Sequence, residues 1–498
     1  MGTSSERDFM VKSQGKPVSL LWVWLFSFIF LIFSHLAVKA FSPNPVSWIF
    51  AITIMIFIGI GWMVLNGDDF GFFLIIFLCG HFVFADNQGG VFPYVFFVVI
   101  VSSMLMIRRK IVVFSSVPFI FHVILLVFFI HQVIGTILNP YSLASKIQFI
   151  VLALSWVLVF YYAASLKISD INIKRFLFSW FAIVIWMFIA ALNQKYHWVI
   201  TLSPLLSQHE MNLSAYGTFE CSELFSEYSC YVFVFSLIIL CNLREFKVLK
   251  IKKSIILPVA FISLCNLIMG VSRASLLLAG VSVFYIIFLN VIVIPSGKNF
   301  RQALIVLAVL PVLVVLVLQL GSLVSTDLMK EDFQKLSHSK LNIKTAISGR
   351  GIHRGNLFIS AVEKLRKESR WLGYGYSKGE NNLKTMGLEK RRLKGYHNLY
   401  LSLPFYFGWG GAVMFILLVF GTGLRSYLTY FRLRKLNHYL VSFALGFAML
   451  WGIFIVNQYK ISLTRSPSYF FLIWMLLGFT HAIVNSSKEV DIHKTEIE

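Results

Sequence analysis

The residues best suited to chemistry in this sequence are a histidine and several arginines. His397 and Asn398 open the run HNLYLSLPFYFGWGG, where a polar segment turns into an apolar one. Arg273 begins the run RASLLLAG, and Arg350 lies in SGRGIHRG with Arg354 four residues later. A guanidinium binds phosphate oxygens in a bidentate way, and a histidine that is neutral near pH 7 is a suitable general base. The set therefore suits transfer of a group from a pyrophosphate-linked donor to a hydroxyl.

Carboxylates and one more arginine accompany this set. Glu220, Glu223 and Glu227 are spaced so that they share one face of a helix, and Arg465 precedes a late apolar run in LTRSPSYFF. Each residue also has a purely structural interpretation. An arginine at a helix end can snorkel to the interface, glutamates can pair with lysines, and a lone histidine can be interfacial. We favour a site because the predicted topology brings all of these residues to one membrane face.

The composition predicts an all-α membrane protein. The chain has 498 residues, of which 58% are hydrophobic and 13% charged, and its mean hydropathy is +0.78. Soluble proteins carry about 25% charged residues, whereas apolar runs of about 20 residues can span a bilayer as helices. The apolar runs are continuous rather than alternating, which favours helices over a β-barrel.

Fourteen apolar segments are long enough to be considered as transmembrane helices. The first is interpreted as a retained span, since it is longer than a signal-peptide core and no small-residue cleavage site follows it. The predicted spans are 19–38, 46–65, 70–85, 91–107, 111–138, 147–166, 176–192, 229–243, 254–270, 274–294, 302–324, 397–423, 439–457 and 469–485.

Lysines and arginines in the short loops predict the orientation. With the N-terminus in the cytoplasm, the basic segments at 108–110, 244–253 and 425–435 all fall inside, and both termini are cytoplasmic. Two longer segments, 193–228 and 325–396, then lie outside. The second carries sixteen Lys or Arg and seven Asp or Glu, a net charge of +9. We therefore divide the chain into an N-terminal bundle (1–324), a large basic loop (325–396) and a C-terminal membrane region (397–498).

No metal site or cofactor is expected from the sequence. The five cysteines are scattered and form no metal-binding cluster. Cys221 and Cys230 could pair in an oxidising compartment, although unpaired thiols are favoured. Arginines can supply the positive charge that a divalent ion would otherwise provide at a pyrophosphate. We also expect no nucleic-acid partner for this membrane protein.

Three ordered segments resemble the O-antigen polymerase/ligase (Wzy–WaaL) superfamily of bacterial envelope enzymes. They are NLIMGVSRASLLLAGVSVF, SGRGIHRGNLFISAVEKL followed by WLGYGYS, and GYHNLYLSLPFYFGWGGAVMF. The resemblance covers about 265–420 and implies a GT-C-like fold with a catalytic periplasmic loop in the bacterial inner membrane. It also implies an undecaprenyl-pyrophosphate-linked oligosaccharide donor and metal-independent glycosyl transfer. On the matching positions, Arg273 and Arg350 would hold the pyrophosphate, and His397 would be the catalytic histidine.

Several functions remain open at this point. Fourteen spans favour a polymerase of polysaccharide repeat units, which would work with a flippase and a chain-length regulator. The main alternative is a ligase that moves the finished chain to lipid A-core or a protein. A lipid-oligosaccharide flippase or transporter is less favoured, because transporters usually place ionisable residues near the midplane of the membrane. Glu220, Glu223, Arg354, Asn398 and Arg465 are predicted to bind substrate.

Overall fold

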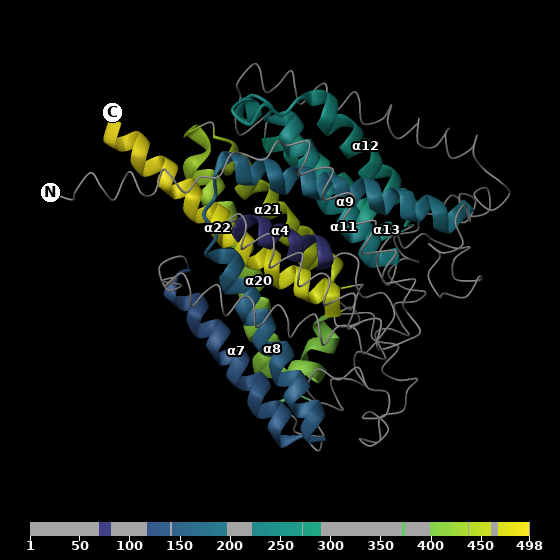
Figure 1. Ribbon diagram of the computed structural model, residues 1–498, viewed down its shortest axis with the longest axis vertical. Helices are drawn as coiled ribbons and strands as arrows, with labels where there is room; N and C mark the ends of the chain where they lie inside the picture. Colours follow the sequence, from purple (N-terminus) through teal and green to yellow (C-terminus); the bar gives the residue numbers. More distant parts are fainter. Residues whose placement is uncertain are drawn as a thin grey trace.

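The structure of the protein is a computed structural model, and every regular element it describes is a helix (Figure 1). The described residues are 69–80, 117–139, 142–196, 222–270, 272–289, 371–373, 399–436, 438–459 and 467–497. The α-helices in these ranges are α4 (Asp69–Gly80), α7 (Phe119–Leu138), α8 (Leu143–Ala164), α9 (Asp170–Tyr196), α11 (Ser222–Cys241), α12 (Lys253–Met269), α13 (Arg273–Phe288), α20 (Leu399–Leu433), α21 (Tyr439–Asn457) and α22 (Pro467–Ile497). Two 3₁₀ turns, η2 (Glu245–Lys247) and η4 (Arg434–Leu436), follow α11 and α20.

The prediction of a helical, multi-pass membrane protein is confirmed. Six of the described helices are long and apolar enough to cross a bilayer: α7, α9, α11, α20, α21 and α22. The remaining described helices contain shorter apolar stretches. Each of them overlaps a predicted span, and α21 has the predicted bounds 439–457. The predicted spans 19–38, 46–65, 91–107 and 302–324 lie outside the described residues.

Two helices are longer than the sequence suggested. Helix α11 begins at Ser222 instead of residue 229, because Glu227 in this stretch is buried and accepts hydrogen bonds inside the protein. Glu223 and Glu227 are therefore part of a membrane helix and not of a loop ahead of it. Helix α20 continues to Leu433, ten residues beyond the predicted end at 423. Its polar residues in that stretch find partners within the bundle, as Ser426 Oγ does by donating to Ala444 O at 2.8 Å.

The helices pack as two groups that meet at α21. Helices α7, α8, α20 and α22 form one group, and α9, α11, α12 and α13 form the other (Figure 1). Helix α21 contacts α20 and α22 on one side and α11 and α13 on the other. The short helix α4 packs against α9 and α22, where the Tyr162 hydroxyl of α8 donates to Asp69 O at 2.7 Å.

Aromatic rings fill the first group. Trp156 of α8 stacks on Trp474 of α22 with 6.2 Å between ring centroids. Phe470 meets both of these rings edge-on, and Phe407 meets Trp156 edge-on. All four side chains are buried. Burying a large aromatic ring contributes both apolar area and specific ring geometry. This cluster holds the first part of α20, which carries the residues that follow His397.

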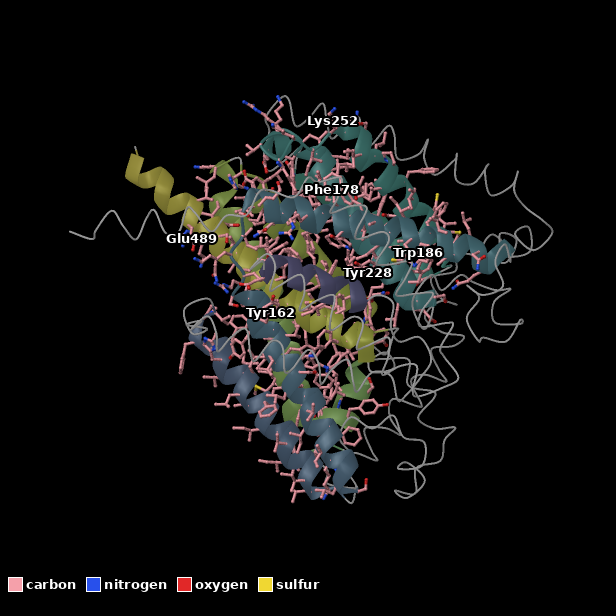
Figure 2. All side chains as sticks on the ribbon, viewed as in Figure 1. Tyr162, Phe178, Trp186, Tyr228, Lys252 and Glu489 are labelled. Carbon is pink, nitrogen blue, oxygen red and sulfur yellow. The ribbon has the colours of Figure 1, made fainter. Side chains whose placement is uncertain are left out.

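One end of the bundle is marked by short polar contacts that α21 makes with α9 and η2. The Tyr439 hydroxyl donates to Asp170 Oδ1 at 2.5 Å, and a serine hydroxyl of α21 donates to Glu245 Oε2 at 2.5 Å. Burial raises the pKa of Glu245 to about 7. Lys252 lies at the top of Figure 2 and Glu489 at its left. Of the basic segments predicted to face the cytoplasm, 244–253 and 425–435 fall at this end, and 108–110 lies outside the described residues.

Candidate functional site

Two of the predicted site residues, Arg273 and Glu223, lie on helices that begin at the opposite end of the bundle. Arg273 is the first residue of α13, and Glu223 lies in the first turn of α11. Helices α20 and α22 begin two residues after His397 and Arg465, respectively. The side chain of Arg273 and the following predicted residues lie outside the part that the structure describes: Glu220, Arg350, Arg354, His397, Asn398 and Arg465.

A buried carboxylate, Glu227, ties these helix ends together. Its Oε1 accepts from the Tyr231 hydroxyl at 2.6 Å and from the Tyr469 hydroxyl at 2.7 Å. Asn457 Nδ2 donates to Oε2 at 2.5 Å, and Gln458 Nε2 lies 2.9 Å from both oxygens. Glu227 has no exposed surface. The carboxylate thus joins α11 to the end of α21 and to the start of α22.

The same cluster reaches the elements that carry Arg273 and His397. Asn457 Nδ2 also donates to Ser275 Oγ at 3.4 Å, in the first turn of α13. The backbone N–H of Leu399 donates to Gln458 O at 2.9 Å, at the first residue of α20. The Tyr400 hydroxyl donates to the Ile455 carbonyl two residues before the end of α21. The ends of five helices, α11, α13, α20, α21 and α22, are therefore joined within a few hydrogen bonds of Glu227.

Close backbone packing brings α12 to the same place. Gly270 follows α12, and a Cβ at this position would lie 2.1 Å from Ser226 Oγ and 3.2 Å from Ser222 O. A larger residue at 270 would require the Ser226 side chain to move, so glycine favours this close approach of α11 and α12. The close approach places the short connection from α12 to Arg273 directly beside the turn of α11 that carries Glu227.

Residues 371–373, in the predicted large loop, are anchored to α20 by main-chain atoms. Gly408 interrupts α20 with φ 70° and ψ 172°, and a Cβ there would lie 2.1 Å from Trp371 O. The Trp409 N–H donates to the same Trp371 carbonyl at 3.1 Å. Asn139, after α7, donates from Nδ2 to Gly373 O at 3.1 Å. The WLG segment of the loop is thus held at the end of the bundle where α20 begins.

Comparison with protein families decides the class of the chain. Residues 258–416 match the model of the O-antigen ligase family, Wzy_C. The match covers 159 of the 498 residues, so the likeness to an O-antigen ligase domain is one of this segment. This confirms the resemblance to the Wzy–WaaL superfamily, whose members transfer oligosaccharides from lipid-linked substrates. No curated protein sequence matches the chain.

The O-antigen ligase domain includes all three residues predicted to be catalytic. Arg273, Arg350 and His397 fall inside the matched segment, as do helix α13 and the first part of α20. Glu227 and the Asn457–Gln458 pair lie outside it, on α11 and at the end of α21. The segments before and after the matched domain therefore contribute the buried network that joins its helix ends.

Sequence reasoning missed Asn457, Gln458 and Tyr469, and it placed Glu227 with the external glutamates. The Glu223–Glu227 pair does lie on α11, but Glu227 points into the protein and is bound by amides and tyrosines. One signal was present: Glu227 and Tyr231 are four residues apart, which places them on one helix face. The partners on α21 and α22 are 230 and 242 residues away, and no local pattern connects them.

Cys230 is a free thiol buried in α11, as the interpretation of unpaired cysteines required. Cys241 and Cys265 are free as well. Cys221 lies outside the described residues.

Proposed function

We propose that the protein polymerises undecaprenyl-pyrophosphate-linked oligosaccharide repeat units into O-antigen, capsular polysaccharide or exopolysaccharide. The match of residues 258–416 to the O-antigen ligase family carries this proposal, because that segment contains the three residues whose chemistry suits the reaction. The reaction takes place at the periplasmic face of the bacterial inner membrane. Fourteen predicted spans favour a polymerase within the superfamily.

Arg273 and Arg350 bind the pyrophosphate of the donor lipid. Their forked guanidinium groups match its oxygens and stabilise the negative charge that grows as the leaving group departs. His397 accepts the proton of the acceptor hydroxyl while that oxygen attacks the anomeric carbon of the donor sugar. A new C–O bond forms, the bond from the sugar to pyrophosphate breaks, and the lipid pyrophosphate keeps the electron pair. The two arginines supply the positive charge, so the transfer needs no metal ion.

The other predicted residues bind the substrates around this centre. Arg354 lies one helical turn after Arg350 in sequence, and Asn398 is adjacent to His397. Arg465 precedes α22, and Glu220 and Glu223 border the start of α11. The hydrogen bonds around Glu227 support this grouping, because they bring the starts of α11, α13, α20 and α22 to one end of the bundle.

The charge bias of the short loops supports an orientation with both termini in the cytoplasm and this end of the bundle in the periplasm. The described contacts are compatible with it, since Asp170, Glu245 and Tyr439 meet at the other end. A flippase that delivers the lipid-linked repeat and a chain-length regulator are the expected partners of such a polymerase.

Substitution of the three residues tests the chemistry. The variant His397→Ala should insert normally and lose a factor of ~10²–10⁴ in transfer rate, which is typical for removal of a general base. The variants Arg273→Lys and Arg350→Lys should restore little of the activity lost in the alanine variants, because lysine lacks the bidentate fork. Purified protein should remain active in EDTA. Parental rates in the His397→Ala variant, or a strict Mg²⁺ requirement, would contradict this mechanism.

A ligase is the second candidate, favoured by the description of the matching family. The two functions differ in the acceptor and not in the donor. Purified protein given only the lipid-linked repeat should form a ladder of longer chains if it is a polymerase. A ligase should instead require lipid A-core or a protein acceptor. In cells, loss of a polymerase should leave single repeats on the surface, whereas loss of a ligase should leave a bare acceptor and accumulated lipid-linked polymer.

A further inference from the structure

Glu227 is an unusual residue for its position. Within the described ranges it is the one acidic side chain without solvent-exposed surface, and it lies in a helix that crosses the membrane. Placing an ionisable side chain in the membrane costs about 2.5–3.5 kcal/mol on insertion scales, and such residues usually serve a function. The transfer chemistry proposed for Arg273, Arg350 and His397 does not use this carboxylate. Its role therefore depends on the groups that its hydrogen bonds hold in place.

The carboxylate fixes which way two amides point. A carboxylate only accepts hydrogen bonds, and the four donors around Glu227 are two tyrosine hydroxyls and the NH₂ groups of Asn457 and Gln458. Both amides must therefore turn their NH₂ groups toward Glu227 and their oxygens away from it. Among the described residues, Asn457 Oδ1 and Gln458 Oε1 are buried without a hydrogen-bond partner. The network thus fixes the conformation of the final turn of α21.

That turn is the link between the two predicted catalytic elements. On one side Asn457 bonds Ser275, two residues after Arg273. On the other side Gln458 accepts from the backbone of Leu399, two residues after His397. The starts of α13 and α20 therefore share a single support, and Glu227 is the group that orders it.

We propose that Glu227 is a positioning residue for the transfer reaction, which sets the placement of Arg273 relative to His397 through the end of α21. The inference rests on the proposed roles of those two residues. A displacement of about 1 Å between reacting groups can cost a factor of ~10² in rate. Glu227 itself does not touch the reacting atoms. A carboxylate that only held helices together would affect folding, whereas a positioning carboxylate affects the turnover of folded protein.

The variant Glu227→Gln separates these two roles. Gln keeps the volume of Glu, and its amide oxygen still accepts from Tyr231 and Tyr469. Its new NH₂ group, however, faces the NH₂ groups of Asn457 and Gln458, so at least one amide must rotate. The kcat of folded protein should fall 10- to 100-fold while the KM for the lipid-linked donor changes less than threefold. The variant Glu245→Gln is the matched control, since Glu245 also accepts a side-chain hydrogen bond but lies at the opposite end of the bundle. Its kcat should stay within twofold of the parent.

A double variant provides the rescue. Combining Glu227→Gln with Asn457→Asp exchanges the carboxylate and the amide, so that the NH₂ group of residue 227 donates to the carboxylate of residue 457. The pair keeps its charge and nearly its volume. Half or more of the lost kcat should return. If Glu227→Gln fails to insert, Tyr469→Phe removes one hydrogen bond to Glu227 and should lower kcat 3- to 10-fold.

Hydrogen exchange gives a readout that does not depend on activity. The Leu399 amide is bonded to Gln458 O, so amides at the start of α20 should exchange at least tenfold faster in Glu227→Gln and at the parental rate in Glu245→Gln. Unchanged exchange, an unchanged kcat, or a double variant as slow as the single one would each overturn the positioning role. Failure of the parent protein to extend or transfer any lipid-linked oligosaccharide would instead overturn the proposed function.

Discussion

Replacing Gly408 by alanine should detach the large loop from the membrane bundle. Gly408 has φ 70° and ψ 172°, a conformation that is essentially restricted to glycine. Adopting it costs an alanine about 1–3 kcal/mol. A Cβ would also lie 2.1 Å from Trp371 O and 2.6 Å from Leu372 C. Both atoms belong to the main chain, so no side-chain rotation relieves the overlap.

The magnitude follows from these two effects together. If the loop moves away, the hydrogen bond from Trp409 N to Trp371 O is lost, which adds about 0.5–1.5 kcal/mol. We expect Gly408→Ala to lower the free energy of unfolding by about 2–4 kcal/mol. Titration with SDS in mixed micelles measures this quantity. Limited proteolysis of the loop and the rate of oligosaccharide transfer report whether the loop has left its place.

Gly452 is the matched control for this experiment. It lies within α21, and a Cβ there would meet nothing within 4 Å. Alanine is the better helix former by up to ~1 kcal/mol, so Gly452→Ala should be neutral or slightly stabilising. The reasoning would be refuted if Gly408→Ala and Gly452→Ala unfolded within 0.5 kcal/mol of each other and left the loop equally resistant to protease.

Three further predictions test other parts of the structure. Gly446→Ala should destabilise the protein by more than 1 kcal/mol in the same titration, because its Cβ would lie 2.3 Å from a buried aromatic ring of α11. Gly452→Ala is again the control, and equal stabilities of the two variants would contradict the close packing of α21 on α11. Burial raises the pKa of Glu245 to about 7, so its contribution to the free energy of unfolding should be complete below pH 4.5 and be lost as the pH rises through about 7. Glu245→Gln should flatten this pH dependence of the free energy of unfolding. An unchanged pH dependence would contradict the burial of Glu245. In a cysteine-free background, cysteines at the exposed positions Tyr459 and Lys252 should react with an impermeant reagent from opposite sides of the membrane, and labelling of both from the periplasm would overturn the orientation.

Where polar residues stand directly at both ends of a helix, its bounds could be predicted from the sequence almost to the residue. Helix α21 is an example, because His438 caps its start and the amides of Asn457 and Gln458 mark its end. Helix α20 was predicted too short because Arg425 and its neighbours suggested a loop. In the structure Arg425 donates to His481 and Asn485 of α22, so the helix continues with its charge bound internally.

The interior of the candidate site could not be predicted in the same way. The pattern around Arg273, Arg350 and His397 was sufficient to indicate the family, because their types and order are read along the chain. The role of Glu227 could not be predicted because it depends on hydrogen-bond donors from two helices that are distant in the sequence. The break at Gly408 is similar, since a glycine in GWGG indicates flexibility but not that a second main chain crosses there.

The contact between the loop and α20 has a consequence for engineering. At Trp371, Gly373 and Gly408 the contact is made by main-chain carbonyl and amide groups, and the glycines leave room for it because they have no side chain. This anchor therefore does not depend on the identity of the residues beyond it. Segment 374–396 enters after Gly373 and leaves just before His397. It is therefore a natural cassette for exchange between relatives. Chimeras joined at these two borders keep both the anchor and the predicted catalytic histidine, so they would test whether this segment influences the choice of substrate.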